Sequence, residues 1–438
     1  MSAIITNELR MYNKETFTKR LLEYPSYVFI GKDTPWKDDQ IPDIPNGSQQ
    51  EYTEVMKEIT GLKRINETNI ISVIMRINWS TNTVYDEYRQ DINMLTARRS
   101  DGRRLQFYVV TDEFNIYKCI SNNSNSPSTI KPTSNQALPF RTSDGYIWKY
   151  MYTLKSSDVF NYMTDAWCPV YTLEEDNGSA QWQSQLSAVD GSLSKINIVS
   201  KGVSYSTLVP PTINITGDGT GASASVTIDP LNGSIQEVNI TNYGQGYTYA
   251  QAEVVSTTGG LGGILDVVLA PKGGHGKDPI RELGGNNLMI FTEISGATDN
   301  DIPLTSFRRA GIVSDMVSKE KGTRIKVDDV SEIHLGNTVV GNNSNATGTV
   351  VLISYDGQYI FLDNVIGTFM QNEPITVEEE YVLSTTDIDN NTDLPLSKQT
   401  AGADSIQPNQ GKLLYLSNRE RISRSETQTE EIRLVVTF

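Results

Sequence analysis

The sequence predicts a mainly β fold with minor α, organised as a discontinuous β-sandwich core with two small β-rich inserted domains. The 438 residues include 33 glycines and 21 tyrosines, a composition typical of strands joined by tight turns. Short apolar runs bounded by turn-forming residues recur along the chain. One such run, residues 432–438, ends the sequence, and a terminal strand frays unless a sheet holds it. We therefore expect strands from the first 190 residues to cover this C-terminal strand and close the core, with both inserts outside it.

Charge and cysteine content exclude several classes of protein. The chain has 37 basic and 53 acidic residues, a net charge of −16, which argues against nucleic acid or an anionic membrane surface as the main partner. Cys119 and Cys168 show no disulfide pattern, and no apolar segment opens the sequence. No apolar run approaches the roughly 18 residues that span a bilayer. We expect synthesis in a reducing cytoplasm, without membrane insertion.

Residues 1–192 are expected to form the N-terminal part of the core domain. Asn13 is the expected cap of a helix that carries Phe17 and Leu21 at helical spacing and ends before Pro25. A buried strand pattern follows at 26–31, and then a surface loop rich in proline and acidic residues.

Two further strand patterns belong to the same part of the chain. Residues 106–111 and 115–121 alternate around a short turn, which predicts a hairpin. Residues 144–154, DGYIWKYMYTL, form the densest aromatic strand of the sequence.

Residues 193–270 contain an internal repeat. INIVSKGVSYS at 196–206 aligns with VNITNYGQGYT at 238–248, and the segments that follow each of them also align. The matched positions are Gly202 with Gly244, Tyr205 with Tyr247, Gly219 with Gly260, and Gly221 with Gly262. Recurring glycines among β-branched residues mark tight turns or close backbone approach. We expect an inserted glycine-rich two-repeat β module, in which each copy is a small unit of strands and the two copies pack together.

The remaining segments alternate between core and insertion. Residues 271–322 are expected to return to the core, and 323–377 to form an inserted small β barrel or sandwich of short strands. The polar stretch 378–410 predicts a flexible linker, and 411–438 predicts a closing hairpin of the core.

Signals for cofactor or metal chemistry are incomplete in the sequence. His275 and His334 are the only histidines and are far apart, which does not favour a zinc site. GGHGK at 273–277 resembles a phosphate-binding loop, but Pro271 replaces its first glycine and Asp278 replaces the magnesium-binding Ser or Thr. We expect a packed turn there and no cofactor.

Signals for calcium or catalysis are equally incomplete. DIDNNTD at 387–393 resembles part of a calcium loop, but Thr392 stands at its glycine position and Lys398 at its final acid. SLSK at 192–195 resembles a nucleophile–lysine pair only as a chance match, and the acidic run 378–380 is expected to be a solvated loop. We therefore expect no catalytic residue, no metal site and no small-molecule substrate, and a protein that is not an enzyme.

Protein interfaces favour arginine and aromatic residues, and these residue types give the candidate interface residues. Arg98 and Arg99 belong, with Arg103 and Arg104, to the densest basic patch of the chain. The interface candidates are Trp36, Trp79, Tyr85, Arg98 and Arg99. A solvated turn is the competing interpretation for the arginines, and burial in the core is the competing interpretation for each aromatic residue.

Several stretches carry a resemblance to a known family. GKLLYLSNRERISRSETQTEEIRLVVTF at 411–438 resembles the C-terminal signature of the baseplate wedge proteins of T-even-type contractile-tailed bacteriophages. VFIGKDTPW at 28–36, DGYIWKYMYTL at 144–154 and FRRAGIV at 307–313 resemble other stretches of that family in the same order. GGHGKDPIRELGG at 273–285 resembles a longer form found in phages of marine bacteria.

The resemblance implies a structural subunit of the virion tail baseplate. It implies a two-layer β-sandwich core without enzymatic activity or cofactor, joined to other baseplate wedge proteins and to a second copy of itself during assembly and host attachment. It assigns no role to the two inserted modules. A receptor-binding or tail-fibre-like adhesin is the main alternative because of those modules, and a glycan-degrading enzyme is a further alternative.

Overall fold

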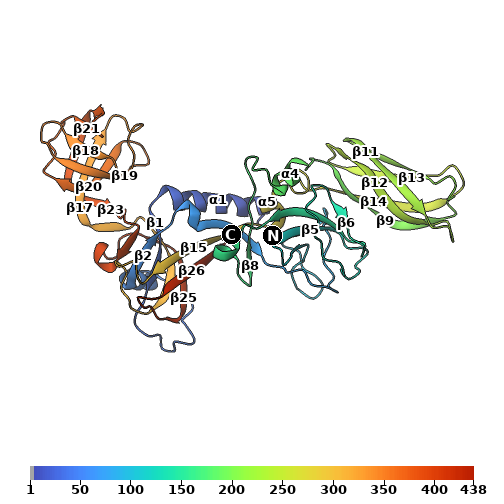
Figure 1. Ribbon diagram of the computed structural model, residues 1–438, viewed down its shortest axis with the longest axis horizontal. Coiled ribbons are helices and arrows are strands. Elements are labelled where there is room, and N and C mark those ends of the chain that lie inside the picture. The colour runs from blue at the N-terminus through green and yellow to red at the C-terminus, as the bar shows by residue number, and fades with distance from the viewer. Residues whose placement is uncertain (1–3) are drawn as a thin grey trace. The chain divides into compact units, whose positions relative to one another are not determined.

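The computed structural model describes residues 4–438 and is mainly β with minor α, as the sequence predicts (Figure 1). The chain divides into two compact units. The first unit contains residues 4–12, 71–288 and 437–438, and the second contains residues 13–70 and 289–436. Residues 1–192, which we expected to lie together in one core, are thus divided between the two units. Such a division depends on contacts between residues far apart in sequence, which local patterns do not report.

A five-stranded antiparallel sheet forms the centre of the second unit. Its strand order is β24 (Thr400–Gly402), β2 (Ile59–Arg64), β1 (Ser26–Gly31), β16 (Phe307–Ser314) and β25 (Lys412–Ile422). All six residues of β1 are buried, as its continuous apolar pattern predicts. Helix α2 (Gln49–Glu58) is capped by Ser48, whose hydroxyl accepts from Glu51 N, and adds Val55 and Met56 to the same core.

A seven-stranded antiparallel sheet is the largest sheet of the second unit and extends beyond the predicted insert 323–377. Its order is β22 (Tyr381–Leu383), β21 (Ile375–Val377), β18 (Thr338–Gly341), β19 (Thr347–Ile353), β20 (Tyr359–Ile366), β17 (Val317–Val327) and β23 (Thr385–Pro395). The expectation of a flexible linker at 378–410 is wrong, because β22, β23 and β24 lie in it. β23 has few apolar residues but pairs along β17 through its main chain and buries Ile388 and Leu394.

The two closing strands do not form a paired hairpin. β25 is paired with β16, whereas β26 (Thr429–Thr437) belongs to another sheet and lies beside β15 (Asn287–Ser295). Ile432 and Leu434 of β26 are buried, but the neighbouring strand comes from 271–322 and not from the first 190 residues. The connector between β25 and β26 is held by Arg424, which is paired with Glu430 at 2.8 Å and donates to the main-chain oxygen of Pro303 at 2.8 Å.

The first unit contains a four-stranded sheet built around the aromatic strand. The order is β4 (Tyr108–Val110), β5 (Asn115–Ser121), β7 (Ile147–Thr153) and β6 (Phe140–Arg141), so β4 and β5 form the predicted hairpin. β3 (Ile70–Met75) pairs with β8 (Trp167–Pro169) nearby in the same unit. Trp148 and Tyr152 of β7 are fully buried, one in each of two apolar clusters.

Helices are short in the first unit. They are α3 (Ser156–Tyr162), α4 (Ala180–Leu186) and α5 (Pro279–Leu283).

The N-terminal helix α1 (Asn7–Glu23) starts earlier than expected, so Asn13 lies inside it and does not cap it. Single-turn 3₁₀ helices lie at Glu67–Asn69 and Ala403–Ser405.

The repeat forms one β-rich module, drawn in green to yellow in Figure 1, and its two copies are interlocked. Its strands are β9 (Leu193–Val203), β10 (Thr212–Gly217), β11 (Thr220–Ile228), β12 (Ile235–Gln245), β13 (Ala250–Val255) and β14 (Leu261–Leu269). β9 pairs with β14, β10 with β13, and β11 with β12. Every pairing therefore joins one copy to the other, and the expectation that each copy is a unit of its own is wrong.

The matched glycines and tyrosines explain why the copies need each other. Tyr205 of the first copy lies against Gly260 of the second, where a Cβ would come within 2.2 Å of the ring. Tyr247 of the second copy lies against Gly219 of the first, where a Cβ would come within 2.5 Å. The Tyr205 hydroxyl also accepts from Gly263 N at 2.9 Å. Each tyrosine therefore needs a glycine in the opposite copy.

Candidate functional site

The aromatic interface candidates are mainly core residues. Trp36 is 8% exposed, with Lys32 and Arg309 over its ring, and its Nε1 donates to the Arg419 main-chain oxygen at 2.9 Å. Tyr85 is 1% exposed. Both are therefore corrected from interface to core residues, because aromatic side chains gain most from burial when a hydrogen bond satisfies their polar atom.

The third aromatic candidate, Trp79, and Arg99 also make internal contacts. Trp79 is half-buried, and its Nε1 donates to Ser128 Oγ at 3.2 Å. Arg99 is half-buried and forms an ion pair with Asp86 at 2.8 Å. Both side chains hold the 78–128 region together in the folded chain.

Arg98 differs from the other candidates because it is exposed and lines a groove of about 780 Å³ in the first unit. We call this groove the arginine groove, after the arginines that line it: Arg10, Arg76, Arg98, Arg103 and Arg104. Its apolar lining includes Met75, Leu95, Leu105, Phe107 and Trp167. Among residues 4–438, no aspartate or glutamate lines the groove.

Few carboxylates neutralise these arginines within the described chain. Arg103 pairs with Asp101 at 2.6 Å, and this contact lowers the pKa of the Asp101 carboxyl. Arg76 donates to the main-chain oxygen of Thr164 at 3.1 Å, and Arg104 contacts a methionine sulfur at 3.2 Å. Within residues 4–438, neither Arg76, Arg98 nor Arg104 forms an ion pair. The groove therefore concentrates positive charge on a chain of net charge −16.

A second cluster, the buried polar network, consists of Lys118, Lys149, Ser194, His275 and Glu282. Lys118 Nζ donates to Glu282 Oε2 at 2.7 Å. Ser194 Oγ lies 2.8 Å from His275 Nε2, whereas His275 Nδ1 lies 3.8 Å from Glu282 Oε2, which is too long for a hydrogen bond. The structure thus brings together SLSK at 192–195 and GGHGK at 273–277, two motifs that are distant in sequence.

Local structure delivers Glu282 to this network. Asp278 caps α5 by accepting a hydrogen bond from Arg281 N at 3.2 Å. Pro279 occupies the first turn, where the N–H that proline lacks would have no partner within the helix. Gly276 N donates to Glu282 Oε1 at 2.7 Å. In a phosphate-binding loop, main-chain amides of this kind would donate to the ligand. Here the Gly276 amide donates to the Glu282 carboxylate instead, as expected of a packed turn.

The order Ser194, His275, Glu282 resembles a hydrolase triad, but its electrostatics do not suit one. Burial and the nearby Lys118 lower the pKa of His275 to about 4, which opposes the imidazolium that a general base must become. Although burial opposes it, Lys118 holds the pKa of Glu282 at about 2, so this carboxylate is committed to Lys118. The cavity beside Ser194 measures about 80 Å³, below the roughly 300 Å³ of small ligand pockets. The network is therefore structural: Lys118 links β5 to α5, and Ser194 links β9 to the loop 273–277.

Two lysines in apolar strands are the sequence feature that indicates this network. Lys118 in NIYKCIS and Lys149 in IWKYMYT are single charges within strands that are otherwise apolar and buried. A lysine is almost never fully buried unless it is paired. A lone lysine in such a strand therefore predicts an internal partner, although it does not identify Glu282.

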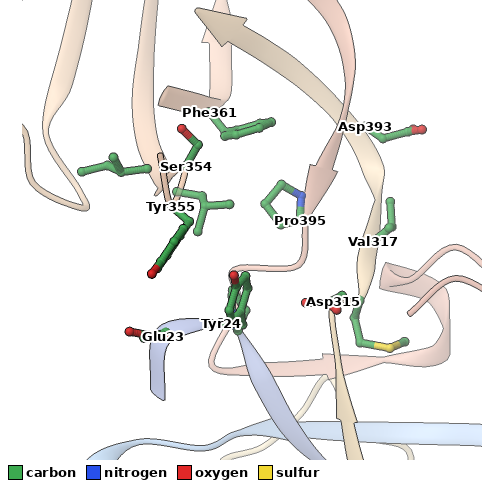
Figure 2. A pocket seen from close by; sticks show the side chains of 13 residues that line it. Glu23, Tyr24, Asp315, Val317, Ser354, Tyr355, Phe361, Asp393 and Pro395 are labelled. Carbon is green, nitrogen blue, oxygen red and sulfur yellow. The ribbon is translucent and has the colours of Figure 1, made fainter. Parts of the chain in front are cut away.

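An apolar cavity of about 300 Å³ lies in the second unit (Figure 2). Tyr24 lies at one side of it and Tyr355 and Phe361 at another, and the two tyrosine rings are stacked with centroids 6.4 Å apart. The acids at its rim are committed to internal pairs: Asp315 contacts Arg20 at 3.1 Å, and Asp393 is paired with Lys321. This cavity lies between the C-terminal end of α1 and the strands β17, β19, β20 and β23.

The calcium-loop resemblance at 387–393 does not correspond to a loop. These residues lie in β23, where Asp387 pairs with Arg324 at 3.0 Å. Across residues 4–438, no group of three or more His, Cys, Asp or Glu side chains is arranged to hold a metal ion. None of the helices in that range is long and apolar enough to cross a membrane.

Comparison with known proteins gives no family assignment: no protein-family model and no curated protein matches this sequence.

Proposed function

We propose that this protein is a structural subunit of the baseplate wedge of a contractile phage tail. In this role it joins neighbouring wedge proteins and a second copy of itself, and it resides in the virion. The proposal starts from the resemblance of the stretches 28–36, 144–154, 307–313 and 411–438 to the wedge family, in the order in which that family has them.

The observation that carries the proposal is the convergence of three of these stretches in one sheet. β1 contains residues of the first stretch, β16 coincides with the third, and β25 belongs to the last. The three strands lie side by side, with Val28 opposite Ile312 and Gly311 opposite Leu416. Segments that are almost 400 residues apart in sequence thus build one structural element, as parts of a common core would.

The chemistry of the buried polar network also supports a structural role. Lys118 and Glu282 pair with each other, Lys149 donates to the main-chain oxygen of Ser184, and the neutral His275 lies beside a cavity too small for a substrate. Such a network holds elements together and does not supply a reactive group.

The decisive experiment removes the protein from a phage that encodes it. Particles without it are expected to have tails with incomplete baseplates, and antibody against the protein should label the baseplate end of normal tails. Complete baseplates in its absence would contradict the proposal. Label along the tail fibres would instead favour the second candidate function.

That second candidate, a receptor-binding or fibre-like adhesin, is favoured by one observation in the repeat module. Leu208 and Leu231, at loops between its strands, are each 93% exposed, and Tyr249 is 60% exposed. Exposed apolar side chains at loop tips are a usual means of binding a surface. Binding of the full chain to host cells, lost on replacing Leu208 and Leu231 by serine, would favour this function over the wedge role.

A further inference from the structure

The arginine groove combines two chemical features that select one kind of occupant. Its rim holds the exposed guanidinium groups of Arg98, Arg103 and Arg104. Its apolar lining includes Met75, which is 38% exposed, and Trp167, which is half-buried. Arginine beside methionine and tryptophan is the composition that protein interfaces favour at their centres.

The positive charge of the groove is available to a partner. In the part of the chain that the structure describes, Arg98 and Arg104 form no ion pair, and no acidic side chain lines the groove. Farther in, the Arg10 guanidinium donates to the main-chain oxygen of Phe438 at 2.5 Å, while its Nε is buried without a hydrogen-bond partner. A buried donor without a partner is costly, and an acceptor entering the groove would satisfy it.

We propose that the arginine groove binds an acidic, extended segment of another protein, in which apolar side chains lie between carboxylates. The carboxylates pair with Arg98 and Arg104, since guanidinium and carboxylate match each other in a two-pronged hydrogen bond. The apolar side chains cover Met75 and Trp167. The inference goes beyond the wedge proposal, because it holds for whichever assembly contains the protein.

The observations favour a peptide over nucleic acid. A nucleic-acid duplex presents its sugar-phosphate backbone, which would match the arginines but would leave the apolar lining of the groove uncovered. The chain also has a net charge of −16, which repels a long polyanion. A short acidic segment bound in the groove interacts mainly with the nearby arginines, because salt screens the more distant charges. The volume of about 780 Å³ accommodates a short segment and lies within the range of peptide and ligand sites.

The test uses the full chain and a fluorescein-labelled synthetic peptide in which Asp and Glu flank a central Leu–Phe pair. Fluorescence anisotropy should show saturable binding that weakens as salt rises, because exposed charge pairs are screened. The Arg98→Ala/Arg104→Ala variant should bind at least about tenfold more weakly, the loss typical of hot-spot residues. A peptide with Gln and Asn in place of the acids should not bind.

Two further variants keep the result interpretable. Lys201→Ala/Lys272→Ala removes the same charge from exposed lysines of the same unit outside the groove, and it should leave binding unchanged. Arg98→Lys/Arg104→Lys keeps the charge but loses the two-pronged geometry, so its affinity should lie between those of the wild type and the alanine variant. This variant also tests the proposal if the alanine variant does not fold.

Four outcomes overturn the proposal. They are absence of peptide binding, equal weakening by the two alanine pairs, tighter binding of a single-stranded oligothymidine than of the peptide, and self-association of the chain that the Arg98→Ala/Arg104→Ala variant abolishes. The last outcome would assign the groove to a second copy of this chain, and the third to nucleic acid.

Discussion

Lys118 Nζ lies 2.7 Å from Glu282 Oε2, and both side chains are almost completely buried, at 1% and 4% exposure. The pair joins β5 to α5, which are distant in sequence. Removing one member of a buried ion pair leaves the other charge without compensation, and this costs far more than the intact pair contributes. The contact therefore governs the stability of the first unit.

Lys118→Met is expected to lower the free energy of unfolding of the first unit by about 3–5 kcal/mol, because the Glu282 carboxylate stays buried without its cation. The double variant Lys118→Met/Glu282→Leu should regain much of this loss. Chemical denaturation followed by tryptophan fluorescence measures both. Lys131→Met is the control, since Lys131 pairs with the exposed Asp112 and Glu113, and it should cost less than about 1 kcal/mol. A similar small effect of Lys118→Met would contradict the network.

Acid should destabilise the first unit through His275. Burial and the nearby Lys118 lower its pKa from 6.5 to about 4, so between these values the unfolded chain binds a proton that the folded chain excludes. The free energy of unfolding therefore has its full value above pH 6.5 and falls by on the order of 3 kcal/mol as the pH drops towards 4. Protonation of Glu282 adds a further loss from pH 4.5 towards 2.

Denaturation midpoints measured at intervals from pH 7 to pH 4.5 test the contribution of His275. His275→Gln should flatten the dependence on pH, whereas His334→Gln, at an exposed position, should leave it unchanged. The same slope in all three proteins would assign the acid sensitivity to other groups.

Gly260→Ala should destabilise the repeat module by about 1–3 kcal/mol, the usual penalty of overpacking, because its Cβ would lie 2.2 Å from the Tyr205 ring. Gly219→Ala should cost a similar amount through Tyr247. Differential scanning calorimetry measures both. In a double-mutant cycle, Tyr205→Leu should rescue Gly260→Ala but not Gly219→Ala. Rescue of both by one change would contradict the reciprocal packing.

Cys119 and Cys168 should be unreactive in the folded protein. Both thiols are buried, and burial raises the pKa of Cys168 to about 12, so the reactive thiolate is scarce at neutral pH. Ellman's reagent should titrate neither thiol in native buffer and both in denaturant. Rapid reaction of one thiol in native buffer would show local opening of β5 or β8.

Local patterns identified much of the fold. The buried strand 26–31, the hairpin of β4 and β5 and the aromatic strand β7 were predictable, because each needs only its own residues to display strand periodicity or turn chemistry. β23 was missed because its stability comes from main-chain pairing with β17, and TTDIDNNTDLP has the composition of a loop.

Local sequence patterns could not predict contacts between residues that are far apart in the sequence. The repeat was visible in its glycines and tyrosines, but the alignment gave no sign that Tyr205 packs against Gly260 of the other copy. Trp36 and Tyr85 were misassigned because an aromatic side chain has the same composition signal in a core and at an interface. Arg98 is exposed, which suits both an interface residue and a solvated turn, so its interface role stays a prediction.

The repeat module and the seven-stranded sheet each begin and end on strands that pair with each other. In the repeat module, Leu193 at the start is paired with Leu269 at the end, and in the seven-stranded sheet Val317 is paired with Pro395. The entry and exit of each module are therefore neighbouring strands, roughly 5 Å apart. A gene could lose either module, or exchange it for another, with only a short turn needed to rejoin the ends. We therefore expect each module to tolerate replacement and changes in length and surface without disturbing the sheet on which β1, β16 and β25 meet.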